Sequence, residues 1–143
     1  MAKTTRSARV LWIDANPVFG GSQSQVQFPA ELSGFFSLPS TPSIGDHVPR
    51  GIHCAGLLFP AKKMDFHHND VWRLNLPTLK QGLGGYPGKL LVFEKTKNQK
   101  IYIFWLVEKT SSIAKKLKAQ TRYSGKVGFK WRDNGTKRRY GYF

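Results

Sequence analysis

The sequence predicts a mostly β protein, a seven-stranded open barrel (a pseudobarrel) with two short α-helices. Short apolar segments rich in β-branched and aromatic residues recur along the chain, and glycine, proline and asparagine separate most of them. Long helices do not alternate with the strands, which argues against a βαβ architecture. At 143 residues the chain is one ordinary domain. We expect a basic N-terminal tail over residues 1–9 and a single folded domain over residues 10–143.

The first third of the chain predicts two strands and a short helix. Val10–Ile13 is a compact apolar run, and Ser22–Phe28 alternates in the manner of a second strand. The following segment, Pro29–Phe36, begins with proline in a first-turn position and brings Leu32, Phe35 and Phe36 onto one helical face.

The middle of the chain predicts four more strands. Gly51–Phe59 reads as a buried strand that ends at Pro60, and Val71–Leu76 reads as the next strand. Lys89–Glu94 and Ile101–Glu108 form the clearest β-hairpin. Because its two runs are almost continuously apolar, we expect both of their faces to be covered.

The last part predicts a second helix and a terminal hairpin. Ser111–Gln120 offers a serine cap and places Ile113 and Leu117 on one face. Val127–Arg132 and Thr136–Phe143 flank a turn, and Val127, Phe129 and Trp131 are expected to face the core.

The formal net charge of +15 favours a polyanionic partner, and nucleic acid is the leading class. An anionic membrane surface is the competitor, but no run is long enough to span a membrane and none combines a basic face with a long apolar one. The start of the chain lacks the apolar core of a secretory signal. A single cysteine, Cys54, cannot form an internal disulfide and reads as a small buried hydrophobe, so a cytoplasmic location is expected.

The stretch Lys62–Leu76 mixes lysine, histidine, asparagine and arginine with a few apolar residues. Asparagine and arginine match base edges in the major groove of DNA, and lysine attracts phosphates. The alternative interpretation is a polar loop that leads into an ordinary strand. The glycine- and amide-rich segment between the first two strands has the same two interpretations.

Catalytic interpretations are weaker, and we expect no catalytic residue, metal ion or cofactor. The four histidines lack the spacing of a zinc site, and the eight acidic residues are scattered. Gly82–Gly85 lacks the lysine and hydroxyl residue of a phosphate-binding loop. Two alternatives stay open: a small metal-dependent nuclease that uses Asp65, His67 and His68, and an RNA-binding basic β-protein. Duplex DNA is favoured over RNA because most aromatic residues occupy strand positions that alternate inward.

The order of these features resembles a known family. A first strand, an amide-rich loop that runs into Val26–Leu32, a helix, and a basic stretch that ends in Asn69–Leu74 are similar to the B-three type DNA-binding pseudobarrel of plant transcription factors. The resemblance is greater to the version that serves as the recognition domain of type II restriction endonucleases of the EcoRII and BfiI kind. It spans about Val10 to Gln120 and rests on the pattern of elements.

The resemblance implies a sequence-specific module for double-stranded DNA that directs a nuclease on another domain or chain. Two loops would enter the major groove like the jaws of a wrench, over Asn16–Gln25 and Lys62–Arg73. The expected base contacts are Gln23, Gln25, His67, His68, Asn69 and Arg73. The expected backbone contacts are Ser22, Ser24, Lys62, Lys63 and Trp72, with Lys126, Lys130 and Arg132 of the terminal hairpin added because of their charge.

Overall fold

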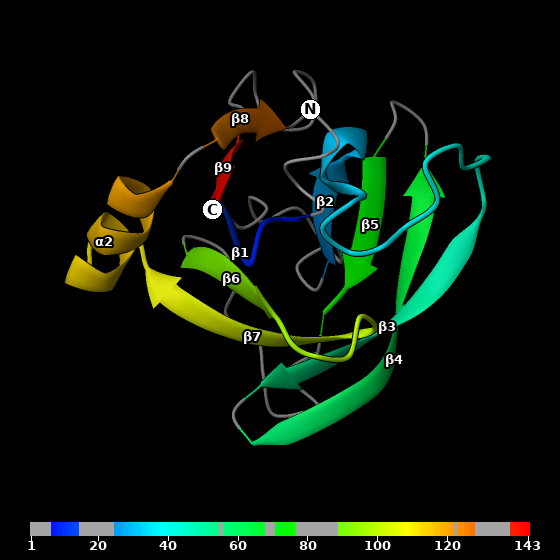
Figure 1. Ribbon diagram of the computed structural model, residues 1–143, viewed down its shortest axis with the longest axis horizontal. Helices are drawn as coiled ribbons and strands as arrows, with labels where there is room; N and C mark the ends of the chain where they lie inside the picture. The colour runs from blue at the N-terminus through cyan, green and yellow to red at the C-terminus, as the bar shows by residue number, and fades with distance from the viewer. Residues whose placement is uncertain are drawn as a thin grey trace.

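In a computed structural model the described residues form one curled β-sheet with an α-helix on its outer side (Figure 1). The structure describes residues 7–14, 25–54, 56–67, 71–76, 89–121, 123–127 and 138–143. Within these ranges the sheet has nine strands in the order β2-β5-β4-β3-β7-β6-β1-β9-β8. The strands are β1 (Val10–Asp14), β2 (Gln25–Pro29), β3 (His47–Cys54), β4 (Leu57–His67), β5 (Val71–Asn75), β6 (Lys89–Lys95), β7 (Ile101–Glu108), β8 (Tyr123–Val127) and β9 (Arg138–Tyr142).

The sheet consists of two antiparallel halves. One half contains β2, β5, β4 and β3, and the other contains β7, β6, β1, β9 and β8. They meet where Gly51–His53 of β3 runs parallel to Ile101–Ile103 of β7. The two edge strands, β2 and β8, approach each other as the sheet curls. The mostly β, open barrel-like architecture is therefore confirmed.

The predicted number of seven strands is wrong, since the described residues form nine. Part of the difference arises because one predicted strand is a hairpin. Gly51–Phe59 contains the turn between β3 and β4, and Gly56 in that turn has a φ of 79°, a conformation that favours glycine. Pro60 does not end the strand. It lies within β4, where the register with β3 shifts between Arg50 and Ile52. This irregularity accommodates a residue that has no N–H to donate.

The concave side of the sheet holds a core rich in aromatic residues. The rings of Phe28 and Phe36 lie 4.8 Å apart, and those of Phe93 and Phe104 lie 4.9 Å apart. Tyr102 is buried beside them, and its hydroxyl donates a hydrogen bond to the carbonyl of Phe35 at 2.9 Å. Each of these large side chains contributes about 1.5–3 kcal/mol through burial alone.

The helix expected over Pro29–Phe36 is wrong in extent, because only the 3-10 helix η2 (Ala30–Leu32) forms. Turns follow η2, and Ser37 has a φ of 54°, which a regular helix excludes. Arg50, buried on β3, fixes this segment. Its guanidinium donates hydrogen bonds to the carbonyls of Phe36, Ser37 and Pro49 at 2.7, 2.8 and 2.6 Å.

The second predicted helix is confirmed as α2 (Ser112–Gln120). The hydroxyl of Ser111 caps it by accepting a hydrogen bond from the N–H of Ala114 at 3.2 Å. Ala114 and Leu117 pack on Leu90, Val92 and Val107, on the side of the sheet opposite the main core. The predicted helical face is partly wrong, because Ile113 is 47% exposed.

The clearest predicted hairpin is confirmed as β6 and β7. The middle of β6 is covered on both faces, but the expectation is partly wrong for β7, where Ile103 is 40% exposed. The terminal hairpin begins earlier than predicted, since β8 starts at Tyr123. Phe129 and Trp131 lie outside the described residues.

The two ends of the described chain lie together. The N–H groups of Arg9 and Val10 donate to the carbonyl of Phe143, at 2.8 and 3.0 Å, and Ala8 is buried. In the described ranges, no helix is both long enough and apolar enough to cross a lipid bilayer.

Candidate nucleic-acid interface

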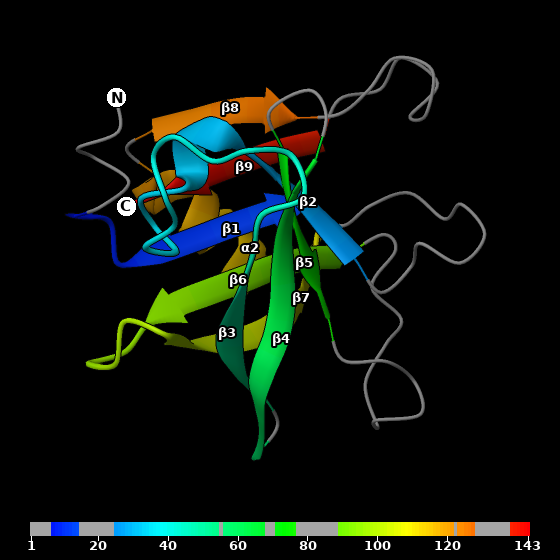
Figure 2. The same ribbon diagram turned by 90° about the vertical axis from the view of Figure 1, so that its right-hand side faces the viewer.

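Several strand ends gather at one end of the sheet, which we call the loop end. The paired registers of β1 with β6, β2 with β5 and β8 with β9 bring their termini there, and β1 and β8 point to the same side in Figure 2. The described strands end and resume three times at this end, at Asp14 and Gln25, at Asn75 and Lys89, and at Val127 and Arg138. The loop end is defined by Asp14, Gln25, Asn75, Lys89, Val127 and Arg138.

Described charges at the loop end are organised around Asp14. Its carboxylate accepts a hydrogen bond from the backbone N–H of Arg139 at 3.0 Å and lies 3.6 Å from the Nζ of Lys109. Lys89 and Glu108 form a second ion pair between β6 and β7. These contacts fix the ends of the strands that carry the connecting segments.

The first predicted jaw, Asn16–Gln25, connects to the loop end. Residues Ser22, Gln23 and Ser24 lie outside the described residues. Gln25 begins β2, and its backbone pairs with Asn75 at the end of β5. The segment thus enters the sheet beside the start of the connection from β5 to β6.

The second predicted jaw, Lys62–Arg73, is wrong as a loop. Lys62 to His67 belong to β4, where Met64 and Phe66 alternate into the core. His68 and Asn69 lie outside the described residues, in the connection between His67 and Val71. Because Val71 pairs with Pro29 whereas Asn75 pairs with Gln25, this connection lies at the other end of β5. Four strand steps, about 14 Å, separate the two places.

Trp72 is wrong as a backbone contact, because its side chain is 0% exposed and stacks beside Phe66 with ring centroids 5.2 Å apart. Alternation along β5 sends Trp72 and Leu74 into the core and leaves Arg73 half-buried on the outer face. The indole N–H of Trp72 finds no hydrogen-bond partner among the described residues.

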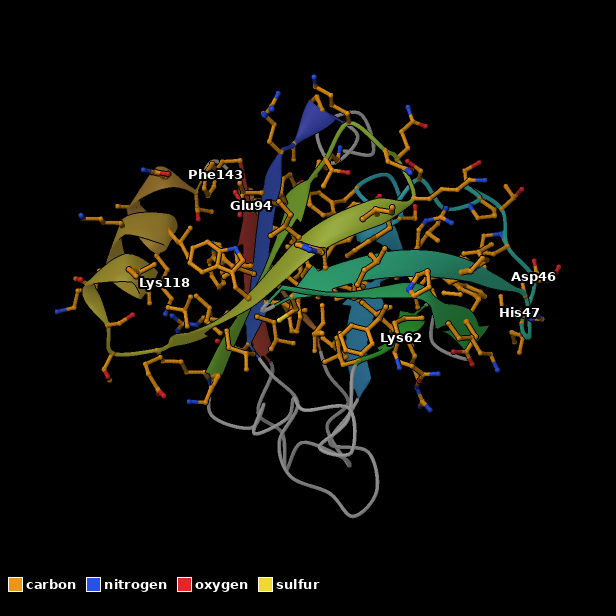
Figure 3. All side chains as sticks on the ribbon, turned by 90° about the horizontal axis from the view of Figure 1, so that it is seen from below. Asp46, His47, Lys62, Glu94, Lys118 and Phe143 are labelled. Atoms are coloured by element: carbon orange, nitrogen blue, oxygen red, sulfur yellow. The ribbon has the colours of Figure 1, made fainter. Side chains whose placement is uncertain are left out.

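The outer face of β3, β4 and β5 is polar and has charges of both signs. The register places His47 beside Asp65, and Asp65 beside Arg73. Lys63 is exposed two residues before Asp65 on β4, whereas Lys62 is half-buried. Burial lowers the pKa of Lys62 from its ordinary value. Figure 3 shows His47 and Asp46 at the edge of the molecule far from α2.

The remaining site residues are only partly described. For His67, Gln25 and Lys126 the structure gives the backbone position, and Lys130 and Arg132 lie outside the described residues. Among described side chains, no group of three histidine, cysteine, aspartate or glutamate residues is arranged to hold a metal ion.

The sequence analysis did not consider that the connection from Leu76 to Lys89 begins beside the first jaw. Within this stretch it considered only Gly82–Gly85, which lack the residues of a phosphate-binding loop. The alternation of Val71–Leu76 followed by Pro77 indicates where this connection starts, but not which other connection shares its end of the sheet. The pairing of β2 with β5 decides which end of the sheet this connection occupies, and sequence patterns do not reveal that pairing.

Sequence comparison gives no family assignment: no protein-family model and no curated protein matches the chain.

Proposed function

We propose that this protein is a sequence-specific recognition module for double-stranded DNA, built on a B-three-like pseudobarrel. The observation that carries the proposal is the loop end. Three segments of a chain with a net charge of +15 leave the rigid sheet at that end. A curled sheet that presents polar segments at one end suits insertion into a major groove, which is about 12 Å wide. By analogy with the family resemblance, it would direct a nuclease carried on another domain or chain.

The proposal revises the pair of jaws. Residues Asn16–Gln25 remain the first jaw, and the connection from β5 to β6 replaces Lys62–Arg73 as the second. Gln23 is the leading base-reading candidate, because the glutamine amide can form two hydrogen bonds with adenine. Lysines near the loop end would neutralise phosphates, so the affinity should fall steeply with salt.

The test begins with selection of bound duplexes from a random library, followed by binding measurements on the selected and a random duplex. We expect Gln23→Ala to weaken binding of the selected duplex by about 1–3 kcal/mol and to leave the random duplex unchanged. Asn69→Ala serves as the matched amide control at the other end of β5, and we expect it to leave the base preference intact.

The outcomes separate the alternatives. Loss of base preference in Asn69→Ala but not in Gln23→Ala would restore the original second jaw and contradict the revised one. Equal competition by structured RNA would favour an RNA-binding protein. Plasmid cleavage in the presence of magnesium or zinc, abolished by His67→Ala or His68→Ala, would favour the small nuclease instead.

A further inference from the structure

Two adjoining cavities flank the turn between β6 and β7. This turn lies away from the loop end (Figure 2). One has a volume of about 370 Å³ and lies between the turn and the segment that contains Gly34 and Ser37. The other has a volume of about 470 Å³ and lies between the turn and Ser7–Arg9. Both are lined by Lys95–Lys97, so they share one wall.

The linings of both cavities contain basic side chains and no acidic residue. Arg9, Lys95 and Lys97 contribute the positive charge. Arg9 and Lys97 are exposed, and neither forms an ion pair with an acidic residue in the described part of the chain. A concave surface lined by charges of one sign concentrates the field on a counter-ion.

A buried charge lies behind the smaller cavity. Arg50 donates to the carbonyl of Ser37, a lining residue, and also to the carbonyls of Phe36 and Pro49. These backbone dipoles stabilise its positive charge. It adds to the potential of the cavity from within the protein.

The shared wall is rigid before any ligand arrives. The Thr96 hydroxyl donates to the carbonyl of Ile101 at 2.8 Å and accepts from the N–H of Asn98 at 3.1 Å. The Asn98 side chain accepts from the N–H of Lys100 at 2.9 Å. Lys95 donates its backbone N–H to Arg9 at 3.0 Å, and its ammonium lies 5.1 Å from the Phe35 ring centre. Because these contacts fix the turn, binding would order few additional groups.

We propose that these cavities bind a compact anion with several charges, the linked phosphate groups of a polyphosphate or a nucleoside polyphosphate. Lysine and arginine together suit phosphate oxygens. The seven residues of β6 separate the turn from the loop end by about 20 Å. The proposal is therefore independent of DNA recognition at the loop end.

The test is a titration of the full chain with inorganic pyrophosphate at constant ionic strength, followed by amide NMR. We expect saturable shifts at Arg9 and Lys95–Lys100, and about tenfold weaker binding in Lys97→Ala, the value of one charge-assisted hydrogen bond. Lys115→Ala is the matched control, because Lys115 is an equally exposed lysine on α2. Its affinity should equal that of the unaltered chain.

Shifts that rise linearly without saturation, or equal weakening in Lys97→Ala and Lys115→Ala, would overturn the proposal in favour of nonspecific charge screening. A short DNA duplex identifies the source of the phosphate. Turn-region shifts that persist when the duplex is bound support a free polyphosphate. Displacement of pyrophosphate from the turn by the duplex would overturn that assignment and make the site a contact for the DNA backbone.

Discussion

The two halves of the sheet bury their strands differently. In the half formed by β7, β6, β1, β9 and β8, the main core covers one face and α2 covers part of the other. In the half formed by β2, β5, β4 and β3, the main core covers one face, and His47, Lys63, Asp65 and Arg73 occupy the other. The sequences reflect this difference, since β6 is almost continuously apolar whereas β4 and β5 alternate. The half that α2 partly covers therefore has apolar packing on both sides of the sheet. The other half has apolar packing on one side and a polar, exposed surface on the other.

Breaking the outer packing of the half that α2 partly covers should have the largest effect. Leu90 is 0% exposed and lies in the cluster beneath α2. We expect Leu90→Ala to lower the free energy of unfolding by about 2–5 kcal/mol, because the cavity cannot be refilled without moving the helix. Denaturant titration measures the effect. A loss below about 1 kcal/mol would contradict the covering role of α2.

Raising the pH should lower the free energy of unfolding through Tyr102, which is buried on the inner face of the same half. Burial raises the pKa of Tyr102 to about 12 from 10.0, and the nearby charge of Arg50 opposes part of this shift. Below pH 10 the phenol is neutral in both states and the stabilisation is complete. As the pH rises from 10 to 12, the unfolded chain loses the proton first, so stability falls by about 3 kcal/mol in total.

The check is the free energy of unfolding of Tyr102→Phe and of the unaltered protein across this pH range. The variant should lose less stability between pH 10 and 12. Parallel curves for the two proteins would show that other groups cause the alkaline loss.

Removing the cap of α2 tests how much the helix itself contributes to the covered face. Ser111→Ala deletes the hydroxyl that accepts from the N–H of Ala114. We expect a loss of about 1 kcal/mol in thermal or chemical unfolding, with Ser111→Asp restoring it. Failure of the aspartate to restore stability would indicate that the serine acts in some other way.

The smallest effect is expected on the polar outer face. Lys63 is exposed on β4, directly opposite Pro49 of β3. We expect Lys63→Ala to change the free energy of unfolding by no more than about 0.5 kcal/mol. This substitution is also the control for Leu90→Ala. A large loss would mean that the outer face stabilises the sheet as well.

Local sequence patterns predicted the elements that depend only on residues close together in the sequence. The β6–β7 hairpin and α2 follow from continuous apolar runs and a capping serine. The β3–β4 hairpin could not be predicted from Pro60, because a register shift in the partner strand accommodates this proline. The burial of Arg50 depends on carbonyls that lie 13 and 14 residues away in sequence.

The second predicted jaw is wrong as a loop for a reason of pairing rather than composition. The residue types of Lys62–Arg73 suit DNA contact, but alternation along β4 and β5 buries Met64, Phe66 and Trp72 in the core. Which connections share an end of the sheet depends on β2 pairing with β5, across more than forty residues of sequence. Local sequence patterns do not reveal that pairing.

The parallel contact between the two halves has a consequence for the folding kinetics. Gly51 donates its N–H to Lys100 at 2.6 Å, and a Cβ at this position would lie 2.9 Å from the Cγ1 of Ile101. The contact closes a loop of fifty residues, whereas the flanking hairpins close short loops. Closing the longer loop costs more chain entropy, so this contact should form after the hairpins. We expect the hairpins to form first and this junction to join the two halves of the sheet after them. Hydrogen exchange at Gly51 during refolding would report that later step.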